Sequence, residues 1–187
     1  MTWNDEIVEQ IDGHWIHQLR PRLTGMTTSE YLWEPVENCS NIRPASSSRS
    51  QTQVGVGEFR LDMVRPLPDP APIPTIAWRM AHVTVSVIGT RLAGLFGRTP
   101  VEYSTWEFAG TADRALDQLD AVYADWIRCV RGLGDDGLLQ PCGESEAAIG
   151  NSPDLPMVAI VVHISREIIH HGAEICLLRD LYAGRSV

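Results

Sequence analysis

The segment "LPMVAIVVHISREIIHHGAEICLLRDLY", residues 155 to 182, constrains the fold most strongly, because its apolar residues recur at alternating spacings of three and four. This spacing is typical of a helix that buries one stripe of side chains against neighbouring helices. One member of the stripe is a histidine, so the sequence predicts a polar side chain inside a helical core. The predicted stripe consists of Val161, Ile164, Ile168, His171, Ile175, Leu178 and Tyr182.

Three further segments, residues 4–23, 75–96 and 112–131, also show helical periodicity. The 75–96 segment is apolar on nearly all sides, which predicts the most buried helix of the set. Thr75 and Thr111 stand where N-cap residues are expected. Four helices of this length predict an all-α fold, an antiparallel four-helix bundle, with residues 1–187 forming a single domain.

Residues 36–74 form a long irregular connection between the first and second predicted helices. The connection begins with a polar stretch that is rich in Gly and Ser and ends with the Pro-rich stretch "RPLPDPAPIP". Between these stretches, "EFRLDMV" is compatible with a brief strand. Connections of this length in compact domains are usually functional or mobile. We therefore expect this one to wrap around the bundle and to shape the mouth of any site there.

Composition excludes several classes of function. The net charge of −9 argues against nucleic-acid binding, which requires a clustered basic face. All 15 basic residues are arginine, which excludes chemistry that depends on a lysine. No apolar run approaches the roughly 18 to 20 residues of a membrane helix, and the acidic N-terminus lacks a signal-peptide pattern. We expect a cytoplasmic protein whose four cysteines, none of them in a CxxC pair, are reduced thiols.

Three residues could meet at one point inside the predicted bundle. His171 falls within the apolar stripe, and Glu167 lies one helical turn earlier at its border. A buried carboxylate requires a compensating partner, which can be an arginine, an imidazolium or a metal cation. His82 stands midway along the apolar 75–96 helix and is the candidate for a third ligand. Two histidines and one glutamate are a set that leaves an open position in catalytic zinc sites.

A metal-independent interpretation stays open beside this one. In it, Glu167 pairs with Arg79 or Arg166, and the histidines are hydrogen-bonded core residues. His163 and His170 flank the candidate set on the same predicted helix, with His170 turned towards the outside. Both are candidates for orienting a ligand or moving a proton.

Several of these segments carry a resemblance to a known family. "TIAWRMAHV" in the second predicted helix, "EIIHHGAEI" in the fourth and "LTGMTTSEYLWEPVENCSNIRP" after the first are similar to the DinB-like (YfiT-like) metalloprotein superfamily. The resemblance covers most of the chain except residues 45–70. It points to the actinobacterial branch that resembles the N-terminal domain of mycothiol-dependent maleylpyruvate isomerase, because that branch has glutamate at the position of Glu167.

The resemblance implies a metal site formed by His82, Glu167 and His171, with zinc favoured and nickel or manganese as alternatives. It further implies a transferase or isomerase in which a low-molecular-weight thiol such as mycothiol adds to a small electrophile. We expect the electrophile to lie between the first helix and residues 36–74. It also implies a homodimer, an expectation that the six tryptophans strengthen if they form exposed surface. The alternative is a non-enzymatic bundle that binds or senses a metal. The isomerase has a further C-terminal domain, so the resemblance gives no expectation for the substrate.

Overall fold

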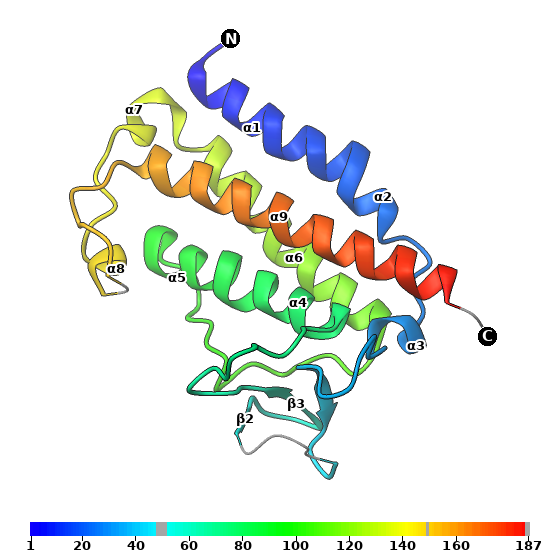
Figure 1. Ribbon diagram of the computed structural model, residues 1–187. Coiled ribbons are helices and arrows are strands. Elements are labelled where there is room, and N and C mark those ends of the chain that lie inside the picture. Colours follow the sequence, from blue (N-terminus) through cyan, green and yellow to red (C-terminus); the bar gives the residue numbers. More distant parts are fainter. Residues whose placement is uncertain (48–51, 149, 186–187) are drawn as a thin grey trace.

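The structure is a computed structural model that describes residues 1–47, 52–148 and 150–185, so residues 48–51 of the expected irregular connection lie outside the described residues. Four long helical segments lie side by side, and the connection between the first two runs along one side of them (Figure 1). The predicted helical bundle is therefore confirmed. No helix in the described part of the chain is both long and apolar enough to cross a membrane.

A π-helical turn interrupts each of the first two long helices. Within the second helix this turn begins directly after His82, and such turns often occur at functional sites because they alter the direction of the side chains around them. The predicted ranges 4–23 and 75–96 agree closely with the observed ones. The first helix consists of α1 (Trp3–His14), η1 (Trp15–Leu19) and α2 (Arg20–Arg22), and the second of α4 (Ile76–His82), η2 (Val83–Gly89) and α5 (Thr90–Phe96).

The third and fourth long helices are continuous. They are α6 (Ala112–Arg131) and α9 (Met157–Gly184), close to the predicted ranges 112–131 and 155–182. The predicted caps are confirmed, because the hydroxyls of Thr75 and Thr111 accept hydrogen bonds from backbone N–H groups of the first turns of α4 and α6. Within the described residues, the connections also contain the short helices α3 (Thr28–Tyr31), α7 (Gly134–Leu138) and α8 (Glu144–Ala147).

The all-α prediction is wrong in one respect, because the connection between the first two long helices contains a small antiparallel sheet. Its strands, β1 (Ile42–Pro44), β2 (Gln53–Val54) and β3 (Phe59–Asp62), are arranged in the order β1-β3-β2. The brief strand expected within "EFRLDMV" is confirmed as β3. Leu61 is fully buried and lies opposite residues of both neighbouring strands, so the sheet packs on the helices through its central strand.

The predicted core stripe of α9 is confirmed over most of its length. Val161, Ile164, Ile168, His171 and Ile175 are buried, whereas Leu178 and Tyr182 near the end of the helix are partly exposed. Next to the buried histidine, α9 passes very close to the first helix. A Cβ atom at Gly172 would lie 2.7 Å from a methyl carbon of Leu19, so a larger residue at this position would require the Leu19 side chain to move.

Candidate metal centre

His171 is held between two carboxylates of its own helix. Its side chain is only 9% exposed, and its Nδ1 lies 2.8 Å from Oε2 of Glu174, one turn further along α9. Its Nε2 lies 3.4 Å from Oε2 of Glu167, one turn earlier. A carboxylate is an acceptor only, so the short contact to Glu174 requires the proton of a neutral imidazole to be on Nδ1. The lone pair of Nε2 then faces Glu167.

His82 reaches the same place from α4. Its ring lies against that of His171, with the two ring centroids 4.9 Å apart and nearly perpendicular planes. Its Nδ1 lies 2.8 Å from the hydroxyl of Tyr103, which comes from the connection between α5 and α6. Burial, reinforced by the nearby positive charge of Arg79, lowers the pKa of His82 to about 4. His82 is therefore a neutral imidazole near pH 7, the form that binds a metal.

Glu167 is weakly engaged within the described part of the chain. Apart from His171, its neighbours are Nδ1 of His163 at 3.7 Å and Nε of Arg166 at 3.9 Å, both longer than a hydrogen bond. Arg166 is 70% exposed, so the predicted pairing with Arg166 is a weak surface contact. The other predicted partner, Arg79, pairs with Glu174 instead, with Nε 2.8 Å from Oε2.

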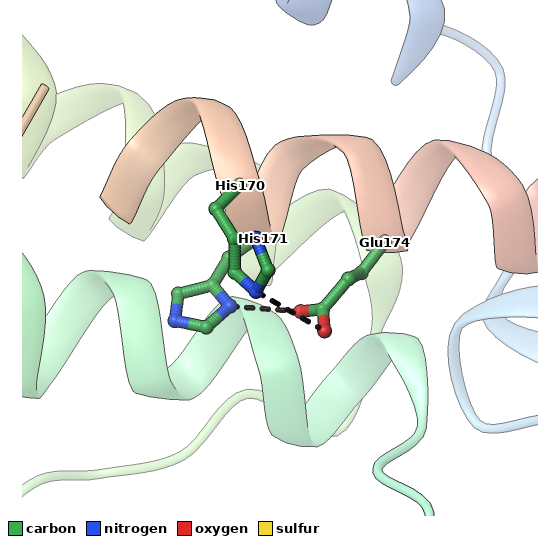
Figure 2. A group of neighbouring side chains, drawn as sticks. All are labelled: His170, His171 and Glu174. Atoms are coloured by element: carbon green, nitrogen blue, oxygen red, sulfur yellow. Dashed lines mark hydrogen bonds and ion pairs between the residues drawn. The ribbon is translucent and has the colours of Figure 1, made fainter. Parts of the chain in front are cut away.

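Glu174, which the sequence did not point to, is part of a possible metal group that differs from the predicted set. Ligand atoms of His170, His171 and Glu174 all lie within 4.8 Å of one another and could hold a metal ion. Figure 2 shows these side chains extending from one stretch of α9. His170 is 64% exposed, as its predicted outward position requires, and its Nε2 lies 3.6 Å from Oε1 of Glu174. The spacing of Glu174, three residues after His171, was the available signal for this contact.

The fold places the rings of His82 and His171 4.9 Å apart and Nε2 of His171 3.4 Å from Oε2 of Glu167. Among the described residues, the group whose ligand atoms lie close enough to hold a metal ion is His170, His171 and Glu174, so the set of His82, Glu167 and His171 stays a prediction.

The fold also adds Glu174 and Tyr103, each in contact with the Nδ1 atom of one of the two predicted histidine ligands. Nδ1 of His163 accepts a hydrogen bond of 2.8 Å from Nη2 of the exposed Arg166. Tyr103 lies 21 residues beyond His82 in an irregular connection, and no periodic pattern links the two residues.

An open pocket of about 400 Å³ adjoins His82. One wall is the segment 62–67, which follows the central strand of the sheet, and the facing wall comes from α4 and η2. The pocket thus confirms that the 36–74 connection shapes a cavity beside a predicted ligand. The expected position of the electrophile between the first helix and this connection stays a prediction, and α1 lines none of this pocket within the described residues. Neither His163 nor His170 lines it.

Comparison with known proteins places the chain in a family. The sequence profile of the DinB superfamily matches residues 10–175. This match covers the second and third long helices, most of the first and fourth, and both histidines of the candidate centre, so the chain belongs to the DinB superfamily. Searches among curated proteins and among solved structures return no significant match.

Proposed function

We propose that His82, Glu167 and His171 hold a divalent metal ion, with zinc favoured and nickel or manganese as alternatives. The observation that carries this proposal is the position of Glu174 on Nδ1 of His171, which directs the free Nε2 towards Glu167. The Nε2–Oε2 separation of 3.4 Å is close to the roughly 3.3 Å between neighbouring ligand atoms of a tetrahedral zinc site with bonds of about 2.0–2.1 Å.

Glu174 and Tyr103 then hold the two imidazoles in place. Histidine ligands commonly donate their second N–H group to a carboxylate or another oxygen, which determines the tautomer and the ring orientation. Glu174 already accepts from His171 and pairs with Arg79, so its oxygens have partners without a metal. Glu167 has no such partner at hydrogen-bond distance in the described chain, and a partly buried carboxylate in that position favours a cation. These contacts support Glu167 over Glu174 as the ligand.

We infer that the protein is a transferase or isomerase that uses a low-molecular-weight thiol of the mycothiol type and acts on a small electrophile. A bound divalent ion would lower the pKa of the thiol. The chain itself supplies a pocket beside His82 in which the electrophile binds. His163 and His170 lie outside this pocket, so we assign them no proton transfer. Such a role suits the cytoplasm, where thiols are kept reduced.

The alternative function is a non-enzymatic metal-binding or metal-sensing bundle. A protein that only stores a metal has no need of a cavity for a second molecule. The pocket of about 400 Å³ next to His82 is large enough for a small substrate, and this supports an enzyme.

The metal site is tested by elemental analysis of the purified wild type and of three variants. We expect His82→Ala and His171→Ala to lose the metal and His170→Ala to retain it. His170→Ala is the matched control, because it removes an imidazole from the neighbouring position of α9. If His170→Ala loses the metal while His82→Ala keeps it, the metal site is the group of His170, His171 and Glu174. Turnover is tested separately, by following loss of free mycothiol with a panel of small electrophiles.

We also propose that the protein is a homodimer. The six tryptophans do not supply the expected exposed surface. Among these only Trp3 is largely exposed. The exposed apolar residues instead gather on α9, where Ile169, Leu177 and Leu181 are 40%, 59% and 50% exposed. Light scattering at micromolar concentration should give a dimer mass, and Leu177→Arg should lower it. Leu139→Arg, at an exposed leucine outside α9, is the control. A monomeric wild type contradicts the proposal.

A further inference from the structure

The pocket beside His82 contains both charged and apolar groups. Its wall 62–67 contributes Arg65 and Asp62, and the facing wall contributes Trp78, His82 and Ser86. The wall formed by residues 62–67 lies within residues 45–70, the part of the chain that the sequence resemblance does not cover. What the pocket accepts is therefore decided by features of this chain.

The acidic group of the pocket is fully engaged. Asp62 is 3% exposed, and its Oδ2 accepts from Nε of Arg43 at 2.8 Å and from the backbone N–H of Asn41 at 3.2 Å. Its Oδ1 accepts from Nε2 of Gln53 at 2.9 Å. Asp62 is thus paired with the buried Arg43, which also pairs with Glu34, and both oxygens of Asp62 have partners other than Arg65.

Arg65 is the uncompensated charge of this pocket. Within the residues that the structure describes, its guanidinium has no ion pair and no hydrogen bond. The other arginine near the pocket, Arg79, is paired with Glu174. Tyr103 lines the same pocket, and its hydroxyl lies 2.8 Å from Nδ1 of His82.

Apolar side chains make up a large part of the remaining lining of the pocket. Met63, Pro66 and Leu67 line the same wall as Arg65. On the facing wall, the indole of Trp78 is held by a hydrogen bond of 2.8 Å from its Nε1 to the backbone oxygen of Asp62. A flat apolar group can lie against this ring without having to order it first.

We propose that this pocket binds a small molecule with an apolar body and one carboxylate, and that Arg65 pairs with the carboxylate. A single arginine among neutral groups fits a monoanion better than a phosphate dianion, which usually requires several donors or cations. Such a ligand would place its other end towards His82. Only this last step rests on the proposed metal-dependent function; the selection for a carboxylate depends on Arg65 and the pocket walls.

The test compares two probes of the same shape, phenylacetate and the neutral phenylacetamide, by NMR titration of the full-length protein. We expect phenylacetate to bind at least about tenfold more tightly, since one charge-assisted pair is absent from the amide complex. Arg65→Gln should remove this preference. Because Arg65 is exposed and has no partner in the described chain, this variant should fold normally. Arg114→Gln, which removes the same charge from an exposed arginine outside the pocket, should keep the preference.

The titrations are repeated after treatment with a chelator. A carboxylate bound directly to a metal would lose affinity on chelation and would not respond to Arg65→Gln, and this result would overturn the inference. Equal affinities for the two probes, or no binding of phenylacetate, would overturn it as well. If the protein holds no metal but still selects phenylacetate through Arg65, the inference stands and the proposed function fails.

Discussion

Glu167 and Glu174 are the two carboxylates beside His171. Replacing each of them by glutamine should show which one binds the metal and which one stabilises the fold. Glu174 accepts from Nδ1 of His171 at 2.8 Å and pairs with Arg79 at 2.8 Å. Charge-assisted hydrogen bonds contribute about 1.5–3 kcal/mol each, but Glu174 is 37% exposed, so solvent reduces this value. We expect Glu174→Gln to lower the free energy of unfolding of the metal-free protein by about 1–3 kcal/mol.

The same change at Glu167 should leave stability almost unaltered. Its contacts to His163, Arg166 and His171 measure 3.4–3.9 Å and include no hydrogen bond in the described chain. Glu167→Gln should therefore shift the free energy of unfolding by no more than about 0.5 kcal/mol. At about 2–4 °C per kcal/mol for a chain of this size, Glu174→Gln lowers the Tm by about 2–12 °C, whereas Glu167→Gln lowers it by no more than about 2 °C.

Metal affinity should change in the opposite order. Loss of a group that orients a ligand lowers affinity by about 10–100-fold, so Glu174→Gln should still bind metal at a weaker Kd. Glu167→Gln removes a charged ligand and should weaken binding by more than this. Competition with a chromophoric chelator measures both values, and thermal denaturation with excess chelator gives the Tm. Glu167→His should restore binding, because imidazole suits the same ions.

The opposite outcome would refute this reasoning. If Glu167→Gln binds metal as tightly as the wild type while Glu174→Gln binds none, then Glu174 is a ligand and Glu167 is not. The centre would then be the group of His170, His171 and Glu174, and the function proposed for the pocket beside His82 would lose its metal.

Two further predictions concern contacts elsewhere in the fold. Tyr103→Phe should weaken metal binding by about 10–100-fold with little change in Tm, because it removes only the group that orients His82; unchanged affinity would mean that the 2.8 Å contact has no such role. Glu146 is 1% exposed and its Oε1 lies 3.0 Å from Nε of Arg91, so Glu146→Ala should cost about 3–5 kcal/mol in urea unfolding. A cost below about 1 kcal/mol would show that the pair behaves like a surface ion pair.

The helices, their caps and the inward position of His171 follow from the sequence alone. Each depends on residues within a few turns of one another, and local spacing determines which side chains share a helix face. The stripe that contains Ile168 and His171 is buried as predicted, and Thr75 and Thr111 cap the helices predicted for them. The strand Phe59–Asp62 was predictable for the same local reason.

The chemistry of the site was decided by the tertiary structure. Periodicity places His171 inside the bundle, but the orientation of its ring depends on Glu174, whose own position depends on Arg79 from another helix. The contact between Tyr103 and His82 and the pocket wall at 62–67 come from irregular connections, where no repeat relates sequence separation to distance. The entropic cost of closing a loop depends only weakly on the length of the loop, so it does not determine which residues of an irregular connection meet. These contacts are therefore determined when the whole chain packs.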